Sequence, residues 1–326
     1  MKISCAFAPS LDSAANTSHA EELGFERAWF FDSPGVYPDV WMMLGLAASC
    51  TKRIGLGPAV IVPSLRHVGV TASAIGTLAE LAPGRVAAAI GTGFTGRRVF
   101  GRKPLHWADV EAYVVALRAL LQGESVEWEG AEIRMMHRPG FAAARPIDVP
   151  ILVAADGPKG QDVARRLGDG VFRASRPKEP SRWPWQALIV YGTVLDDEAD
   201  VHSERVIDAA GPSLAAGFHA AYERGADAVD AFPGGREWRS MIETVPAETR
   251  HQVLYEGHLH ELMERDRPAV LEAASLLPKL TFTGTPDTLR ARVERLEELG
   301  VTELVWQPAG SDIPGELRRM ASALMR

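Results

Sequence analysis

Residues 150–174 read PILVAADGPKGQDVARRLGDGVFRA, and this stretch decides the fold class. Two short, mostly apolar runs, 150–155 and 170–174, flank a helical segment in which Val163 and Leu167 lie four residues apart, on one face. Such runs are typical of strands that are covered on both sides. A strand, a helix and a second strand in this order form a parallel βα unit. The stretch therefore predicts an α/β protein with a parallel sheet.

The same alternation continues along the chain and predicts eight strands. Eight strands joined by right-handed crossovers indicate a closed (β/α)₈ TIM barrel. Residues 175–185 contain three prolines and cannot form a normal sixth helix, so an open doubly wound sheet remains the alternative. The predicted strands are Lys2 to Ala8, Glu26 to Asp32, Ile54 to Val62, Arg85 to Gly91, Pro150 to Ala155, Gly170 to Ala174, Ala187 to Leu195 and Val301 to Gln307.

A TIM barrel ordinarily needs about 250 residues, so the 326-residue chain has a surplus. We assign part of it to a small hairpin after the fourth helix, Ser125 to Met135, which turns at Glu129-Gly130. The rest is predicted to be a helical insertion at about 199–280, between the seventh and eighth strands. No low-complexity linker divides the chain, and we treat residues 1–326 as one domain.

Composition restricts the class of protein. The chain is 46% hydrophobic with a net charge of −7 and without a block of like charge, which argues against nucleic-acid or anionic-membrane partners. Its two cysteines, Cys5 and Cys50, cannot build a disulfide framework and fit a reducing compartment. The sequence starts with a strand-like stretch that lacks the features of a signal peptide, and no apolar run reaches the ~18 residues of a membrane span. We expect a soluble, cytoplasmic protein.

In a barrel of this kind, chemistry takes place at the C-terminal ends of the strands. The fourth strand ends in Gly91-Thr92-Gly93, which continues to Gly96 as a GxGxxG pattern. A dinucleotide fingerprint should open a helix directly and be followed ~20 residues later by an acid at a strand end. Here the acid at that spacing is Glu111, inside a helix, so this interpretation is disfavoured. The glycines either let a flat ligand approach the backbone or simply form a turn.

The fifth strand is followed by Ala155-Asp156-Gly157-Pro158-Lys159, which enters a helix. With Gly157 as cap and Pro158 at the first helical position, the next backbone N–H groups are free to bind an anion such as phosphate. Arg97 and Arg98, after the fourth strand, add cations whose planar head suits phosphate oxygens. The structural alternatives are a capped helix that binds nothing and solvated arginines.

Asp32 is the carboxylate at a strand terminus, and it can bond a ligand's polar edge or exchange protons. Its equal alternative is to cap the following turn. Arg66 and His67, past the third strand, offer another cation and another titratable group.

Several reaction classes lack their motifs. No metal site is predicted, because HExxH is absent and His258 and His260, two apart on a predicted helix, point to different faces. A GxSxG elbow and a Walker loop are also missing. A phosphorylated aromatic cofactor in an apolar, glycine-lined cavity remains.

These stretches together resemble the luciferase-like monooxygenase superfamily, especially its deazaflavin-dependent, methylenetetrahydromethanopterin reductase-like branch. The resemblance spans nearly the whole chain and implies a (β/α)₈ barrel with an insertion before the last strand. The stretches that carry it are Gly84-Arg85-Val86 through Ile90-Gly91-Thr92-Gly93, the Gly101 to Gly130 segment, Ala154 to Gly157 with Gly168-Asp169-Gly170, and Phe282-Thr283-Gly284-Thr285-Pro286.

The resemblance also implies where the cofactor binds. The helix start at Gly157 and Arg98 would hold its phosphate, a non-proline cis peptide at Ala59-Val60 would lie beneath its ring, and Asp32 would approach the ring's polar edge. Phe94 stands where the sugar-phosphate dehydrogenases of the family carry an acid, so no substrate is identified. The predicted cofactor-binding set is Asp32, Ala59, Val60, Gly91, Thr92, Gly93, Arg98, Ala155, Asp156, Gly157, Pro158 and Lys159.

The resulting hypothesis is an oxidoreductase that transfers hydride between deazaflavin coenzyme F420 and an organic substrate, with Asp32 and His67 as the candidate catalytic residues. One alternative is a two-component monooxygenase that uses reduced FMN from a separate reductase together with oxygen. A non-catalytic flavin-binding protein and a cofactor-free isomerase of phosphorylated compounds are the others. A homodimer is expected, with Trp41-Met42-Met43-Leu44 either at its interface or packed on the barrel.

Overall fold

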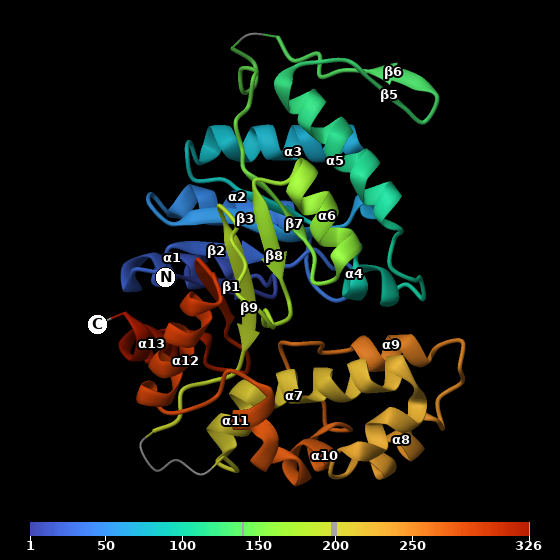
Figure 1. The fold of residues 1–326 in the computed structure, drawn as a ribbon, viewed down its shortest axis with the longest axis vertical. Helices are drawn as coiled ribbons and strands as arrows, with labels where there is room; N and C mark the ends of the chain where they lie inside the picture. The colour runs from blue at the N-terminus through green and yellow to red at the C-terminus, as the bar shows by residue number, and fades with distance from the viewer. Residues whose placement is uncertain (139, 197–200, 326) are drawn as a thin grey trace.

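The computed structural model describes residues 1–138, 140–196 and 201–325, and it contains the predicted closed barrel of eight parallel strands (Figure 1). Closure rules out the open doubly wound sheet. The strands follow the order β1-β10-β9-β8-β7-β4-β3-β2 around the barrel. Their bounds are β1 Lys2–Phe7, β2 Arg27–Phe30, β3 Gly55–Ile61, β4 Ala88–Ile90, β7 Ile151–Ala154, β8 Gly170–Arg173, β9 Gln186–Tyr191 and β10 Glu303–Gln307.

Helices cover the outside of the barrel because each carries one apolar stripe. In α5 (Trp107–Gln122), for example, Val110, Val114 and Leu117 are all fully buried. Helix α12 starts at its predicted cap, where the Thr285 side chain accepts a hydrogen bond from the backbone N–H of Thr288. The helices of this layer besides α5 are α1 Ser13–Leu23, α2 Val40–Cys50, α3 Val68–Leu81, α6 Pro158–Leu167, α12 Pro286–Glu298 and α13 Ile313–Leu324. Two short elements, the 3₁₀ turn η1 Pro63–Leu65 and α4 Phe94–Arg98, follow β3 and β4 directly.

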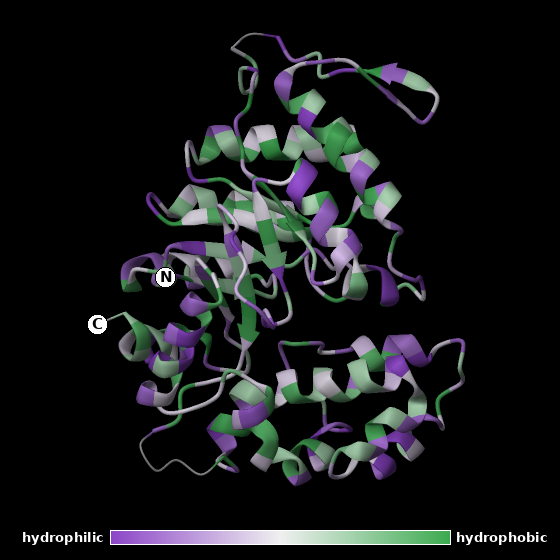
Figure 2. Cartoon of the chain, viewed as in Figure 1, coloured by the Kyte–Doolittle hydropathy of each residue, from purple (hydrophilic) through white to green (hydrophobic). Residues whose placement is uncertain are grey.

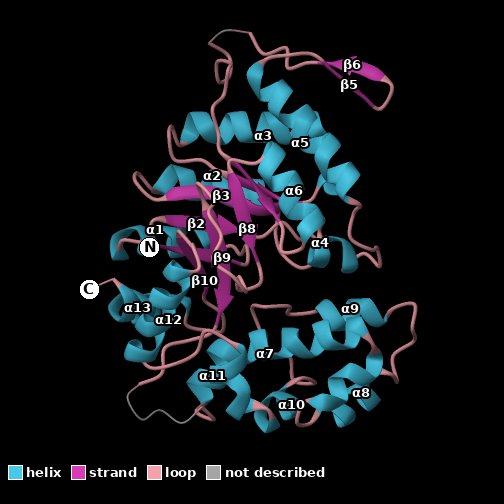
Figure 3. Cartoon of the chain, in the orientation of Figure 1, coloured by secondary structure: helices cyan, strands magenta, loops and turns pink. Residues whose placement is uncertain are grey.

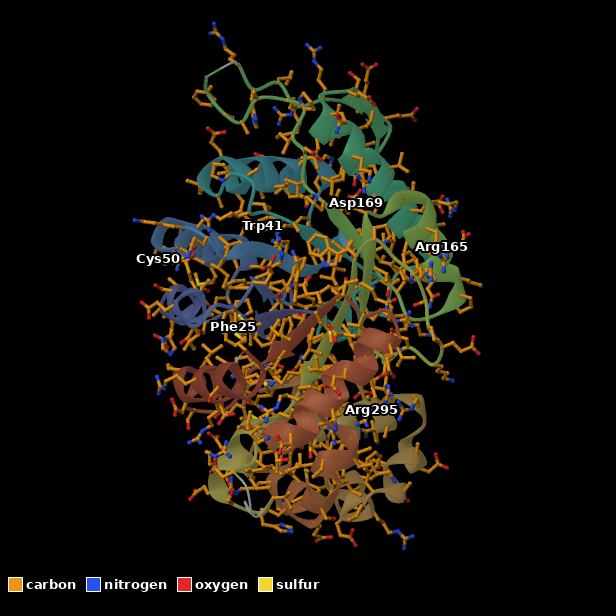
Figure 4. The ribbon with its side chains drawn as sticks, turned by 60° about the vertical axis from the view of Figure 1, so that its left-hand side comes forward. Phe25, Trp41, Cys50, Arg165, Asp169 and Arg295 are labelled. Carbon is orange, nitrogen blue, oxygen red and sulfur yellow. The ribbon has the colours of Figure 1, made fainter. Side chains whose placement is uncertain are left out.

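No helix forms over residues 175–185, as the three prolines predict. Trp183 from this segment instead packs on Val163 of α6 and on Val153 and Val171 of the strands. The exposed Arg165 of α6, labelled in Figure 4, lies over the Trp183 ring at 4.3 Å from its centroid. A single tryptophan therefore covers the part of the barrel where a sixth helix would lie.

The interior of the barrel is filled by small side chains and a few large ones. Ala6, Ala87 and Ala187 leave the space that the fully buried Trp29 occupies. At the N-terminal end, the buried Glu303 carboxylate accepts hydrogen bonds from the indole N–H groups of Trp29 and Trp185. Figure 2 shows the strands β8 and β9 as apolar along most of their length. This closed end leaves the opposite, C-terminal end for a site.

The predicted hairpin and insertion are both present. Strands β5 (Val126–Trp128) and β6 (Ala131–Ile133) pair antiparallel through Glu129 and Gly130, whose φ angles of 51° and 79° are those of a type I′ turn. The insertion between β9 and β10 is all helical and forms a lobe beside the barrel (Figure 3). Its predicted start at about 199 lies outside the described residues. It contains α7 Glu204–Arg224, η2 Ala226–Ala231, α8 Gly235–Ile242, α9 Arg250–Tyr255, α10 Arg267–Glu272, η3 Ala274–Leu276 and α11 Leu277–Leu280.

The insertion has a hydrophobic core of its own, in which Phe218 packs against Phe232 and Trp238. One polar cluster is buried beside this core. Asp266 accepts a hydrogen bond from the Trp238 indole and lies 3.7 Å from the Nε2 atom of His219. Within the described residues, none of the helices is both long and apolar enough to cross a membrane.

Candidate active site

A cavity of about 560 Å³ lies at the C-terminal ends of the barrel strands. The barrel contributes the ends of β2, β3, β4, β7, β8 and β9, while the insertion contributes α7 and the segment around His258. A larger groove of about 990 Å³ runs between α12 and α13, but it contains none of the predicted site residues. The strand-end cavity is therefore the candidate active site, because parallel barrels carry out chemistry at this end.

Most of the predicted cofactor-binding residues line this cavity. Those that do are Asp32, Ala59, Val60, Gly91, Thr92, Gly93, Ala155 and Asp156. Gly157, Pro158 and Lys159 follow directly and begin α6. Arg98 and His67 do not line the cavity.

The wall formed by β3 and β4 is tightly packed. The peptide bond Ala59-Val60 is cis, as predicted, and both residues line the cavity. A Cβ on Gly91 would lie 3.1 Å from the Cγ2 atom of Val60. Gly93 has φ +78°, and a Cβ there would lie 2.4 Å from the Cγ1 atom of Val62. Gly93 does not tolerate a larger residue, Gly91 leaves little room for one, and together they leave a surface that a planar ring can approach.

Asp32 is buried at the edge of this wall. Its Oδ2 accepts a hydrogen bond from Arg66 rather than from the following turn, so the turn-capping alternative does not apply. Burial raises the pKa of the Asp32 carboxyl, although the Arg66 guanidinium opposes that shift. Within the described residues its Oδ1 makes no well-formed hydrogen bond, although the nearby backbone N–H of Val62 favours the charged form. This oxygen is available to a ligand.

Arg66 bridges two carboxylates, since its second amino group lies 2.7 Å from Oδ2 of Asp39. Asp39 in turn caps α2 by accepting from the backbone N–H groups of Trp41 and Met42. The guanidinium charge is therefore shared within the protein, and Arg66 positions Asp32.

His67 has a structural role in this arrangement. Its Nδ1 accepts a hydrogen bond from the backbone N–H of Gly69 and so caps α3. The ring packs edge-on against Trp128 of the hairpin. The structure thus places His67 away from the cavity that it was expected to reach.

The expected phosphate site lies at the start of α6. Gly157 precedes the helix in an extended conformation, and Pro158 occupies the first turn. Because glycine has no side chain to cap the helix, the first backbone N–H groups are left without a capping acceptor. Gly160 is required by packing, because a Cβ there would lie 2.2 Å from Cζ2 of the cavity residue Trp107. This helix start borders the cavity through Ala155 and Asp156.

Arg98 is already paired. Its guanidinium forms an ion pair with Glu223 of α7 and lies 4.6 Å from the centroid of the Phe94 ring. A phosphate that binds Arg98 has to compete with the Glu223 carboxylate.

The insertion supplies residues that the sequence reasoning missed. His258 and His260 were expected on a helix, but α9 ends at Tyr255 and the chain turns through Gly257 and Leu259, both at positive φ. His258 lines the cavity, and its Nε2 lies 3.3 Å from Oγ1 of Thr95. The signals available in the sequence were Gly257 and the two histidines, which had been weighed only as metal ligands.

Burial dominates the chemistry of His258. Together with the neighbouring rings of His219 and His260, which have the smaller effect, it lowers the pKa of the imidazole to about 3. His258 is therefore neutral at physiological pH and acts through hydrogen bonds. The described residues contain no group of three or more side chains able to hold a metal ion.

Known proteins place this barrel in a family. The sequence model of the luciferase-like monooxygenase family matches residues 12–303. The chain belongs to that family. It is 30% identical over 317 residues to a 5,10-methylenetetrahydromethanopterin reductase of Methanolobus tindarius, covering 94% of this chain and 91% of the relative.

Two further relatives match this chain over nearly its whole length. An F420-dependent glucose-6-phosphate dehydrogenase of Beutenbergia cavernae is 29% identical over 338 residues, covering 98% of this chain and 93% of the relative. The coenzyme F420 dependent tetrahydromethanopterin reductase from Methanopyrus kandleri superposes with a TM-score of 0.66 at 21% identity, covering 99% and 98% of the two chains. The barrel of this luciferase-like protein is thus the family fold.

Proposed function

We propose that this protein is an F420-dependent oxidoreductase that transfers hydride between coenzyme F420 and an organic substrate. The observation that carries the proposal is the glycine-lined cavity with the buried carboxylate of Asp32 at its edge, whose Oδ1 makes no well-formed hydrogen bond within the described residues. Membership in the luciferase-like family and the F420-dependent relatives support the choice of cofactor.

The residues present fit such a cofactor. Ala59, Val60 and the wall from Gly91 to Gly93 would hold a planar ring, with Asp32 bonding its polar edge. The helix start at Gly157, Pro158 and Lys159 would hold the phosphate, as would Arg98 once it leaves Glu223. When bound, F420 would supply hydride chemistry, and the protein's part would be to bind the ring and orient it.

The test is titration of the protein with F420 while its tryptophan fluorescence is followed. We expect saturable binding that weakens at least tenfold when Arg98→Gln and Lys159→Gln are combined, because two cations near the phosphate are lost. Lys279→Gln, on the exposed surface of α11, is the matched control and should bind as the wild type does.

A third variant probes the competition at Arg98. Glu223→Gln removes the carboxylate that holds this guanidinium, so F420 affinity should rise rather than fall. Unchanged affinity in both the double variant and Glu223→Gln would contradict the phosphate site. Tight binding of reduced FMN without any binding of F420 would favour a two-component monooxygenase supplied by a separate reductase.

We also propose that the protein is a cytoplasmic homodimer. Both cysteines are free, with Cys5 buried and Cys50 exposed at the end of α2 (Figure 4). On the same helix Met43 and Leu44 pack on the barrel, whereas Met42 is 68% exposed. Light scattering of the wild type and of Met42→Glu tests the interface, because a dimer that uses this face should dissociate in the variant.

A further inference from the structure

Next to the end of β4, the wall of the cavity contains a pair of neutral polar side chains. Thr95, in α4, is half-buried and lines the cavity. Behind it lies His258, whose Nε2 is 3.3 Å from the Thr95 hydroxyl. The two residues come from the barrel and from the insertion, so the pair exists only when both parts of the fold are assembled.

The backbone around His258 is anchored to the barrel at three consecutive residues. The carbonyl of His258 accepts a hydrogen bond from the Tyr37 hydroxyl, that of Leu259 from the Gln307 amide at 2.6 Å, and that of His260 from the Gly310 N–H at 3.1 Å. The donors come from the loops after β2 and β10 and from the end of β10 itself. The imidazole is therefore held against Thr95 by the barrel, although it belongs to the insertion.

The surroundings decide which ring nitrogen of His258 carries the proton. Within the described residues its Nδ1 is buried without a hydrogen-bond partner. A buried N–H without an acceptor is rarer and costlier than a buried lone pair without a donor. The favoured tautomer therefore has the hydrogen on Nε2, where it is donated to the Thr95 oxygen. Thr95 then has its own O–H free to donate into the cavity.

The charge of the cavity indicates what kind of substrate it accepts. Among the described residues that line it, none is a lysine or an arginine. The two lining carboxylates already face arginines, Asp32 with Arg66 and Asp156 with Arg173 at 3.7 Å. A phosphate or carboxylate on the substrate would find no free cation here, whereas an uncharged oxygen would find the Thr95 hydroxyl.

We propose that Thr95, held in place by His258, donates the hydrogen bond that binds the oxygen of an uncharged carbonyl or alcohol substrate. This inference rests on the proposed hydride-transfer function. In the direction of carbonyl reduction, bound reduced F420 would give up a hydride and be oxidised, the hydride would form the new C–H bond, and the π electrons of C=O would move to the oxygen. That oxygen takes a proton from water to give the alcohol. The Thr95 hydrogen bond strengthens as negative charge develops on the oxygen, and His258 acts as a positioning residue behind it.

Cyclohexanone labelled with ¹³C at its carbonyl is the probe, and 4-oxocyclohexane-1-carboxylate is its charged counterpart. F420 affinity is measured first for the wild type, Thr95→Val, Thr95→Ser and His258→Phe. It should be alike in all four, which shows that the variants are folded and separates this inference from the proposed function. Failure of the wild type to bind F420 refutes the proposed function itself, and this inference with it.

With F420 bound, we expect the carbonyl resonance of the probe to move downfield in the wild type and in Thr95→Ser, but not in Thr95→Val. With reduced F420, Thr95→Val should lower kcat/KM for cyclohexanone by about 100- to 1000-fold, the loss typical of a donor to a developing oxyanion. Thr95→Ser should stay within about threefold, and His258→Phe should fall between the two.

Three results would overturn the proposal. One is a carbonyl resonance that does not move in a wild-type protein that binds F420. Another is wild-type kcat/KM in Thr95→Val. The third is a preference for the carboxylate-bearing ketone over cyclohexanone, which would mean that the site supplies a cation.

Discussion

Lowering the pH from 7.5 to 5.0 should cost the native protein about 2 kcal/mol of folding free energy through His258 alone. The imidazole has its ordinary pKa of 6.5 in the unfolded chain, whereas burial lowers that pKa to about 3 in the folded protein. Below pH 6.5 the unfolded chain therefore binds a proton that the folded chain does not. Each pH unit below 6.5 costs about 1.4 kcal/mol, and pH 5.0 lies 1.5 units below it.

The sign of the effect follows from the direction of the shift. The contribution of His258 to stability is complete above pH 6.5 and is lost as the pH falls from 6.5 toward 3. Urea unfolding at pH 7.5, 6.5, 5.5 and 5.0, followed by tryptophan fluorescence and circular dichroism together, measures it. Coincident transitions in the two signals allow the free energies to be compared.

His258→Gln and His258→Phe both remove the titrating group, one with and one without a hydrogen-bonding side chain. Over this pH range the wild type should lose about 2 kcal/mol more than either variant. Equal losses in all three proteins would show that the pKa of His258 in the folded state is close to its ordinary value. The inference that a neutral His258 imidazole donates a hydrogen bond to Thr95 would then be wrong as well.

Three further substitutions test other parts of the structure. Asp32→Asn should weaken F420 binding about tenfold or more in a fluorescence titration, because a charged acceptor is lost, and unchanged affinity would remove Asp32 from the site. Gly160→Ala should lower stability in thermal unfolding by about 1–3 kcal/mol through overlap with Trp107, whereas Gly45→Ala, which has open space, should not. Arg205→Met should cost about 1–3 kcal/mol in urea unfolding, because the buried Glu316 carboxylate loses its ion pair at 2.8 Å and keeps, among the described residues, only the Thr193 hydroxyl and Arg319 at 3.7 Å. Adding Glu316→Leu should recover much of that loss, and failure to do so would mean that the lost ion pair is not its cause.

Local rules were enough to predict much of this fold. Each strand is a run of apolar residues, and the cap at Thr285 and the turn at Glu129-Gly130 depend on neighbours within a few positions. The prolines between 175 and 185 excluded a helix for an equally local reason, the missing backbone donor. The glycine-rich wall and the cis bond at Ala59-Val60 were recognised from the residue pattern of a family rather than from physical reasoning.

The sequence by itself determined the barrel, the hairpin, the helical insertion and the strand-end residues from Ala59 to Asp156 that line the cavity. Only the tertiary structure decided which side chains face that cavity. His67 caps its own helix, and Arg98 pairs with Glu223. His258 contacts Thr95 although it lies 163 positions further along the chain. Backbone periodicity is local and can be read along a chain. His67 bonds a residue only two positions away, but the directions of Arg98 and His258 are set by partners that are distant in sequence and meet only when the insertion packs on the barrel.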